Sequence, residues 1–409
     1  MMSAQQRILQ TASFQTLITA SLGLLFLALP ISSTAKSIFL VSSVILVLSW
    51  PAHREQLRDV FSHGWCKAAL FLFFIALIAC LWSPALYSER ILVLEKYSKL
   101  LFLPILAVGF RDENTRKYAL NAFLLAMTIT ALVSIYKYWS VSPFGIDDPG
   151  HVFRNHIMTG YMIAFSAYLS LLLAFRQAGR NRLIYGLLFG LFSYQIWFVN
   201  TGRTGYVIYL ILLILFIVQF FSWRQGLLVL LISCSLLAII YYEHPGIQTR
   251  VEQIVEDLQS YSQNQKDTSV GYRLQFHSFA RQLFMHQPYW GNGTGSFTYL
   301  FSELKPVPSW DRRLLEPHSF YWLVAAEFGL VGISALLFFF ASLLAAAYRL
   351  DTMRAMAFAI LLPFMAGNLS DSLLFYSGSG YFFILFMALC LGEALGRQKK
   401  LQEGANRQA

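Results

Sequence analysis

The chain contains 409 residues, of which 57% are hydrophobic and only 13% are charged. Soluble globular domains carry about 25% charged residues, so the composition excludes an ordinary soluble protein. The formal net charge of +10 does not indicate nucleic-acid binding, because most basic residues lie in short segments between apolar runs. That placement is typical of membrane topology and of contact with anionic lipids.

Apolar runs of membrane-spanning length recur along the whole chain. A helix needs about 20 mainly apolar residues to cross about 30 Å of hydrocarbon. We therefore predict an all-α polytopic membrane protein with about twelve transmembrane helices. The predicted spans are residues 15–31, 35–50, 67–82, 91–109, 118–139, 157–175, 183–200, 204–221, 226–242, 319–347, 355–370 and 378–396.

Basic residues alternate in abundance between successive connecting segments. The segments on the side of the N-terminus hold more than half of the 31 lysines and arginines. The short opposite loops hold only Lys36, Arg90, Arg154 and Arg203. Cytoplasmic loops are enriched in Lys and Arg, so we predict that both termini are cytoplasmic and that the long polar segment lies outside the cytoplasm.

This topology divides the chain into three parts. Residues 1–242 are predicted to contain the first nine transmembrane helices, residues 243–317 to form one large external loop, and residues 318–409 to contain the last three helices and a cytoplasmic tail. The four cysteines lie in or beside apolar runs. Neither a disulfide framework nor a cysteine-ligated metal is therefore expected in the loop.

Several charged residues in the N-terminal part are interpreted as structural rather than functional. Glu95, Lys96 and Lys99 fall in one predicted span, where we expect them to pair with one another or to line a polar cavity. Residues 147–148 are two aspartates close to His151 in an external segment, and we interpret them as a solvated loop.

The hairpin Thr201–Gly205 reads Thr-Gly-Arg-Thr-Gly between two predicted spans. Its glycines would let the backbone approach a ligand closely. A helix that begins near Thr204 would direct free N–H groups and a positive dipole outward, and Arg203 would add a planar guanidinium suited to phosphate oxygens. A tight turn with an arginine that reaches lipid headgroups fits the same residues equally well.

The external loop carries two amphipathic patterns. Residues 247–261 alternate apolar and polar faces at helical spacing, which predicts a helix along the membrane surface or over the bundle. A second helix follows, with Arg273, His277 and Arg281 aligned on one side. Its predicted buried stripe is Tyr272, Phe276, Phe279, Ala280 and Leu283. Acidic and basic residues nearly balance in the loop, so anion recognition must come from specific arginines. The Gly-rich run 291–295 is interpreted as a flexible turn.

His318 lies where this polar segment meets the next apolar run. An ionisable group at the rim of a membrane helix is a functional-site candidate by default. Glu316, two residues earlier, is an alternative base, and Asp371 lies near the external end of a later span. Asp371 could orient His318 or an arginine, or could cap the next helix.

His318-Ser319 is followed after nine residues by Gly329 and, two residues later, by Gly332. This His-Ser-x9-Gly-x-x-Gly pattern, after a large external loop, resembles the signature of bacterial lipopolysaccharide O-antigen ligases within the ligase and polymerase superfamily. We expect the two glycines, which lie on one helix face, to let a neighbouring helix pack closely and to hold the His-bearing end rigid.

The resemblance implies a metal-independent, inverting glycosyl transfer at the periplasmic face of the bacterial inner membrane. The donor would be O-antigen polysaccharide on undecaprenyl pyrophosphate, and the acceptor the lipid A–core oligosaccharide. His318 would orient or deprotonate the acceptor hydroxyl. Arg203 and Arg273 would hold the pyrophosphate, with Arg90 and His277 as further donor-site contacts.

The supporting residues are expected to be Asp371, Ser319, Gly329 and Gly332. No cofactor, metal or nucleic acid is expected, and membrane lipids are the other expected partners. An O-antigen polymerase and a protein O-oligosaccharyltransferase remain alternatives, as does a non-enzymatic transporter of lipid-linked glycans. The residues leave the glycan repeat, the acceptor hydroxyl and the oligomeric state open.

Overall fold

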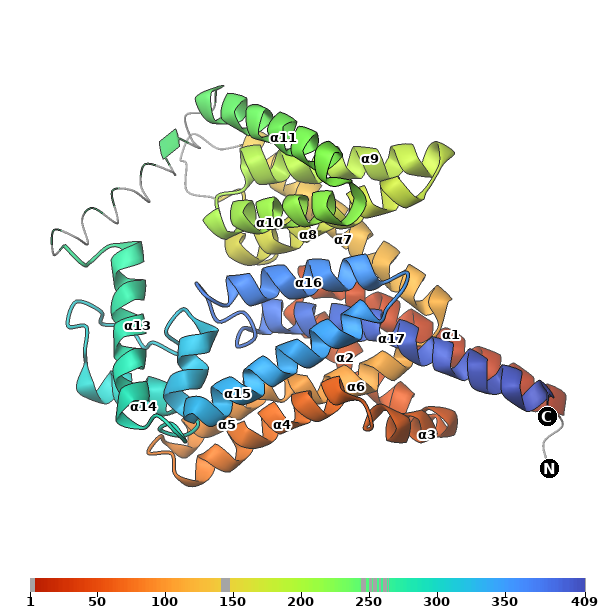
Figure 1. Ribbon diagram of the computed structural model, residues 1–409, viewed down its shortest axis with the longest axis horizontal. Coiled ribbons are helices and arrows are strands. Elements are labelled where there is room, and N and C mark those ends of the chain that lie inside the picture. The colour runs from red at the N-terminus through yellow and green to blue at the C-terminus, as the bar shows by residue number, and fades with distance from the viewer. Residues whose placement is uncertain are drawn as a thin grey trace.

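The computed structural model describes residues 4–140, 148–243, 248–249, 252, 256, 259, 263 and 265–408. Every regular element in these residues is a helix, and none is a strand, as predicted. The first predicted amphipathic helix, 247–261, lies mostly outside the described residues. The bundle carries α13 and α14 at one end and the start of α1 with the end of α17 at the other (Figure 1).

The helices follow the predicted apolar runs closely. The N-terminal part contains α1 (Ala4–Ile31), α2 (Ser33–Ser49), α3 (Pro51–Val60), α4 (Gly64–Ile78) with a 3-10 turn (Ala79–Leu81), α5 (Tyr87–Tyr97), α6 (Lys99–Gly109) and α7 (Glu113–Trp139). Next come α8 (His156–Arg176), α9 (Gly179–Tyr194) with a π-helical turn (Gln195–Val199), α10 (Arg203–Phe220) and α11 (Trp223–Glu243). The remainder contains α13 (Ser269–His286), α14 (Ser296–Leu304), α15 (Phe320–Tyr348), α16 (Arg354–Gly367) and α17 (Ser377–Gln408).

Within the described chain, eight helices are long and apolar enough to cross a membrane, or nine if α2 and α3, bent by 98°, form one span. The helices Thr204–Phe220 and Arg354–Gly367 are apolar but shorter. The expected count of twelve is therefore not confirmed. The span predicted at 91–109 is two helices that meet at Ser98, and Lys99 at the start of the second helix is turned toward the carbonyls of Leu374 and Phe375.

Polar side chains set several helix starts. Asp112 accepts the Thr115 N–H at 2.9 Å before α7, and Asn155 accepts the Met158 N–H at 2.9 Å before α8. Thr268 accepts the Gly271 N–H at 3.1 Å before α13. Such caps satisfy N–H groups that the first helical turn leaves without a partner.

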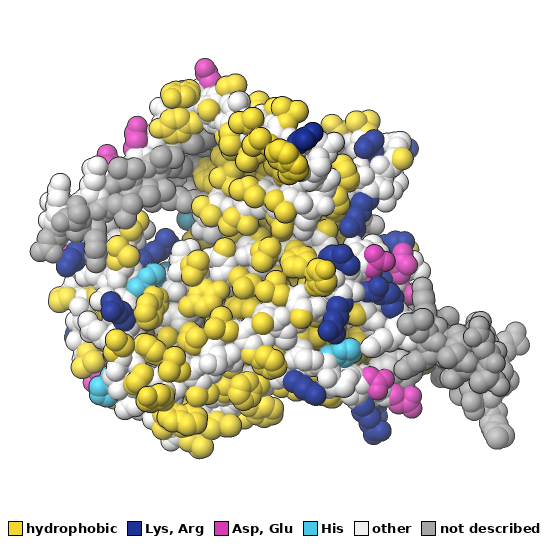
Figure 2. Space-filling view, viewed as in Figure 1, with side chains coloured by type: hydrophobic (Ala, Val, Ile, Leu, Met, Phe, Trp, Pro, Cys, Tyr) yellow, Lys and Arg dark blue, Asp and Glu magenta, His cyan; other side chains and the backbone are white. Residues whose placement is uncertain are grey.

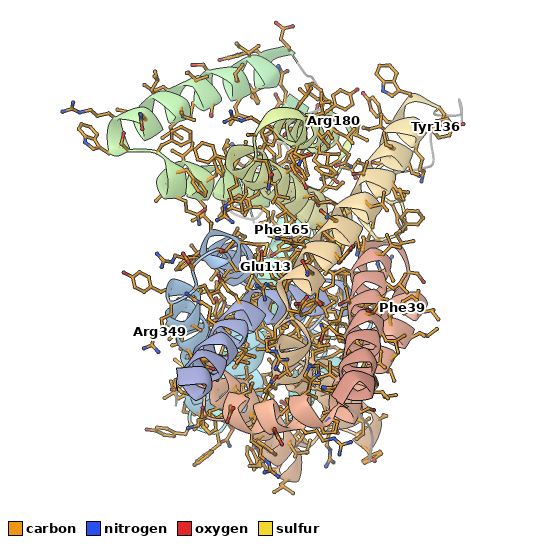
Figure 3. The ribbon with its side chains drawn as sticks, turned by 90° about the vertical axis from the view of Figure 1, so that its right-hand side faces the viewer. Phe39, Glu113, Tyr136, Phe165, Arg180 and Arg349 are labelled. Atoms are coloured by element: carbon orange, nitrogen blue, oxygen red, sulfur yellow. The ribbon has the colours of Figure 1, made fainter. Side chains whose placement is uncertain are left out.

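The core joins helices that are distant in sequence. α1 packs on α2 and α7, α8 on α9 and α10, and α17 on α6 and α16. Phe386 of α17 lies 4.8–4.9 Å between ring centroids from Phe26 of α1, Phe123 of α7 and Phe165 of α8. Figure 3 shows α7 running from Glu113, in the group of helices around α1 and α17, to Tyr136 beside the group formed by α8 to α11. Aromatic rings in tilted and edge-to-face contact thus connect the two groups.

The surface separates apolar from charged side chains. Hydrophobic side chains cover the middle of the face seen in Figure 2, and lysines and arginines gather toward the end that carries both termini. Large apolar residues such as Ile38, Leu125 and Leu236 are more than half exposed. An apolar belt with charged ends is the distribution expected of a multi-pass membrane protein.

Candidate active site

His318 begins a short connection that is locked against the loop between α16 and α17. Its backbone is left-handed, with φ at 55°, which is uncommon for a residue with a side chain. The next residue, Ser319, precedes α15 and donates its hydroxyl to the Asn368 carbonyl at 3.4 Å. The Phe320 N–H reaches the carbonyls of Asn368 and Asp371 at 3.0 and 3.3 Å. Ser319 therefore supports the site by fixing the position of the backbone that follows His318.

Two buried carboxylates hold the His318 ring. Nδ1 lies 3.2 Å from Glu316 Oε1 and 3.6 Å from Asp371 Oδ1. The side chains of Glu316 and Asp371 are 3% and 10% exposed, whereas that of His318 is 25% exposed. Because Nδ1 itself is buried, the exposed part of the ring lies elsewhere, and Nε2 is the nitrogen left for a substrate.

Glu316 is fixed in turn by two donors. Its Oε2 accepts the backbone N–H of His318 at 2.6 Å, and its Oε1 accepts the Tyr376 hydroxyl at 2.5 Å. Lys99 donates to the carbonyls of Leu374 and Phe375 at 2.9 and 3.0 Å, directly before Tyr376. Glu316 is therefore placed to orient His318, rather than to act as the alternative base. The sequence offers no signal for Tyr376, because its partner lies 60 residues away.

These charges change the ionisation of the site. Burial alone would lower the pKa of His318, but the nearby carboxylates of Asp371 and Glu316 raise it above its usual range, and the positive charge of Arg273 opposes them. Burial and the same carboxylates raise the pKa of Tyr376, so the phenol stays a proton donor to Glu316. The arrangement stabilises the imidazolium that forms when His318 takes up a proton.

α13 contributes the other half of the site. His277 Nε2 lies 3.1 Å from the His318 carbonyl oxygen, and the Phe276 ring stacks 6.0 Å from the His318 ring. Burial lowers the pKa of His277, as do the charges of His318 and Arg273, while the hydrogen bond to the His318 backbone raises it in part. His277 therefore supports the His318 backbone. Four of the five residues in the predicted stripe, Phe276, Phe279, Ala280 and Leu283, are buried, whereas Tyr272 is partly exposed.

Arg273 lies one helical turn before His277. Its charge acts on His318, His277 and Tyr376, which places the guanidinium beside the catalytic candidate. Across the residues that the structure describes, Arg273 makes no hydrogen bond and no ion pair. A half-buried guanidinium without a protein partner is available to an anionic ligand.

Gly329 breaks α15 instead of packing a neighbouring helix. Its φ and ψ are 61° and −152°, a region essentially restricted to glycine. The break receives the backbone of 288–293: the N–H groups of Leu330 and Val331 donate to the carbonyls of Pro288 and Tyr289 at 2.8 and 3.2 Å. A Cβ at Gly329 would lie 2.5 Å from the Tyr289 carbonyl oxygen. The expectation of a helix-packing glycine pair was wrong.

The Gly-rich run 291–295 is correspondingly fixed. The Gly293 N–H donates to the Glu327 carbonyl at 2.8 Å, and the Gly295 N–H donates to the buried Glu327 Oε1 at 2.9 Å. A Cβ at Gly332 would lie 2.3 Å from Phe328 Cβ, on the other side of the break. Gly329 and Gly332 therefore shape α15 locally, and the run 291–295 is a bound segment rather than a flexible turn.

The hairpin that carries Arg203 lies at the same end of the bundle as His318. A Cβ placed on Gly367, beside Asn368, would lie 3.9 Å from Ile208 Cδ1 in the second turn of α10. α10 begins at Arg203, whose side chain is not described. The convergence of Arg203 on His318 therefore stays a prediction.

The hairpin glycines face protein rather than an open site. Cβ atoms placed on Gly205 and Gly160 would lie 2.8 and 2.7 Å from Asn200 Nδ2, and one on Gly202 would lie 3.0 Å from the His156 carbonyl oxygen. Close packing of α10 on α8 therefore accounts for these glycines.

Asp148 ties this hairpin to α8. It accepts hydrogen bonds from Thr201 Oγ1 at 2.6 Å and from the Gly150 N–H at 2.9 Å, and it pairs with His156 Nδ1 at 2.7 Å. The interpretation as a solvated loop was wrong for Asp148, while Asp147 lies outside the described residues. His156 was missed, because a histidine one residue inside a helix start has no distinctive pattern.

Arg90 lies at the turn between α4 and α5. Its Nε and Nη1 donate to the carbonyls of Ala85 and Cys80 at 2.7 and 3.1 Å. Two of its five N–H donors therefore hold that turn, and its role toward the donor substrate stays a prediction. Lys96 pairs with Glu95 at 3.8 Å, as expected, whereas Lys99 does not join them.

Glu316, His318 and Asp371 also form a group whose ligand atoms lie within 4.8 Å of one another. That spacing would admit a metal ion. However, Nδ1 points at both carboxylates, and Glu316 already binds Tyr376 and a backbone N–H. The same geometry explains an oriented histidine without a metal.

Residues 186–337 match the family model described as O-antigen ligase. The match extends from α9 through the loop, α13 and α14 into α15, and it includes Arg203, Arg273 and His318. No curated protein sequence matches the chain.

Proposed function

We propose that the chain, whose residues 186–337 match the family model described as O-antigen ligase, acts as such a ligase and moves O-antigen polysaccharide from undecaprenyl pyrophosphate to the lipid A–core oligosaccharide. Its apolar helices and this match indicate a multi-pass protein of the inner membrane. In the proposal both termini are cytoplasmic and the reaction takes place at the periplasmic face.

One observation carries the proposal. A partly exposed imidazole, held at Nδ1 by two buried carboxylates, lies beside a guanidinium that has no partner in the described chain. A base that is oriented through one ring nitrogen can accept a proton at the other. A free guanidinium beside it can hold the anion that leaves.

The reaction would be a single displacement. The acceptor hydroxyl oxygen forms a bond to the anomeric carbon as the bond from that carbon to the pyrophosphate oxygen breaks. The hydroxyl proton passes to His318 Nε2, and the electron pair of the broken bond stays on the pyrophosphate. Back-side attack inverts the anomeric centre. A pyrophosphate is stable as an anion, so Arg273 and Arg203 are required for electrostatic holding and not for protonation.

The arrangement of charges supports the proposed orientation. His318, α13 and the start of α10 lie at one end of the bundle, and lysines and arginines gather at the other end, with the termini (Figures 1 and 2). Under the positive-inside rule this distribution favours a periplasmic site. Both substrates are lipid-anchored, and a site at the membrane rim can receive both.

A transporter of lipid-linked glycans is less well supported. Transporters use broken helices near the bilayer midplane to bind substrate or ions. α15 is broken at Gly329, but the backbone of 288–293 occupies the break through hydrogen bonds. The break therefore has a structural partner, and the N–H groups of Leu330 and Val331 are bonded within the protein.

Deletion of the gene tests the proposal in one gel. Loss of a ligase leaves core lipopolysaccharide without polymer and accumulates long lipid-linked chains. Loss of a polymerase leaves a single repeat on the core, and loss of a protein O-oligosaccharyltransferase leaves lipopolysaccharide unchanged. Either of the last two results would refute the proposed acceptor.

A further inference from the structure

A cavity lies at the opposite end of α15 from His318. It has a volume of about 530 Å³ and is lined by residues at the start of α4, the end of α15 and the later part of α17. α4 begins at Gly64, α15 ends at Tyr348, and the candidate span in α17 ends at Gln398. Because three spans end around it, the cavity lies at a membrane–water boundary.

The cavity is basic at its mouth. Arg349, Arg397 and His63 line it, and none of its lining residues is acidic. Arg397 Nη2 donates to the Arg349 carbonyl at 2.9 Å, which draws the two arginines together. The Arg349 guanidinium itself has no hydrogen bond or ion pair to any residue that the structure describes. Glu393 lies one helical turn before Arg397 on α17. Its carboxylate accepts hydrogen bonds from the N–H groups of residues 351–353.

The wall of the cavity is apolar and continues into the bilayer. Trp65, Ala345, Leu391 and Ala394 line it below the arginines. Phe338, 49% exposed, precedes Ser342 by one helical turn and continues the same face of α15 toward the middle of the membrane. A ligand that fits would carry an anionic head and at least one apolar chain.

We propose that this cavity binds the headgroup of an anionic glycerophospholipid, with its phosphate at Arg349 and Arg397 and an acyl chain along Phe338. Basic pockets between transmembrane helices at the cytoplasmic boundary suit such headgroups. A free phosphate would meet the same arginines, but it would leave the apolar wall unused. The bound lipid would connect the ends of α4, α15 and α17, and so would stabilise the helix that carries His318 at its other end.

The test uses the purified full-length protein in a neutral detergent. Thermal unfolding is followed with phosphatidylglycerol, with phosphatidylcholine of the same acyl chains, and with inorganic phosphate, and bound lipids are counted by native mass spectrometry. Phosphatidylglycerol should raise the unfolding midpoint and remain bound. Phosphatidylcholine and inorganic phosphate should do neither. An equal shift with either of these two would overturn the proposal.

Two variants and one control locate the site. Arg349→Gln should weaken phosphatidylglycerol binding about fivefold, the effect of one basic residue near an anionic headgroup. Ala345→Phe fills the cavity and keeps both arginines, and it should abolish the shift. Arg180→Gln removes an exposed arginine of the separate α8–α11 group, as Figure 3 shows, and should respond like the parent protein. An unchanged response in Arg349→Gln, or an equal loss in Arg180→Gln, would overturn the assignment.

Discussion

The Tyr376 hydroxyl donates a 2.5 Å hydrogen bond to Glu316 Oε1, the same oxygen that lies 3.2 Å from His318 Nδ1. The loop before α17 thereby controls the residue that orients the imidazole before α15. Substitutions at this site should therefore separate two effects: removal of the base and loss of its orientation.

His318→Ala should reduce transfer by about 10²–10⁴-fold, the usual contribution of a positioned acid–base group. Folding should persist, because the side chain is partly exposed and the Phe320 N–H contacts that hold the start of α15 come from the backbone. Transfer of radiolabelled glycan to core lipopolysaccharide measures the loss, and the unfolding midpoint is the control. Full activity of the variant would remove the catalytic role of His318.

Glu316→Gln and Asp371→Asn should each shift the acid limb of the pH–rate profile to lower pH. In the proposed mechanism the neutral imidazole is the base, and the two carboxylates raise the pKa of His318. Loss of one negative charge lowers that pKa, so the neutral form persists at lower pH, while the maximal rate falls because orientation is lost. The profile of kcat/KM reports the shift. A limb that stays in place in both variants would contradict this coupling.

Arg273→Ala should lower kcat by about 10²–10³-fold, as expected when one group that stabilises developing negative charge is removed. Arg281, two helical turns further along α13, is exposed and provides the matched control. Arg281→Ala should retain activity, and Arg273→Lys should recover only part of it, because an ammonium lacks the planar fork. Equal losses in the Arg273→Ala and Arg281→Ala variants would indicate a general charge effect.

Gly329→Ala should destabilise the protein by at least about 1–3 kcal/mol, the cost of this backbone conformation for a residue with Cβ. The steric conflict with the Tyr289 carbonyl adds to that cost. Gly190→Ala is the control, because a Cβ at Gly190 on α9 meets nothing within 4 Å. Thermal unfolding distinguishes the two variants. Equal midpoints would show that the break in α15 tolerates a side chain.

Treatment with a chelator should leave transfer unchanged. Glu316 and Asp371 both face His318 Nδ1, so these three residues can hold one another without an ion. The measurement is the rate before and after dialysis against EDTA, with and without added Mg²⁺ or Zn²⁺. Activity that disappears and returns with one metal would assign the group as a metal site instead.

The helical class, the positions of the apolar runs, the buried stripe of α13 and the resemblance to O-antigen ligases could be read from the amino-acid sequence alone. These features are local or periodic, so hydropathy and spacing reveal them along a single chain. His318, Arg273 and His277 could also be selected as candidates, because ionisable groups at the rims of membrane helices are few.

Which partners those residues contact follows only from the folded chain. The contacts of Glu316 with Tyr376, of Lys99 with Leu374, and of Gly329 with Tyr289 join segments that are far apart in the chain. A spacing pattern assigned Gly329 and Gly332 to helix packing, whereas the fold inserts 288–293 at that point. Such pairings arise because buried polar groups must find partners wherever the folded chain brings them, and no local pattern encodes that choice.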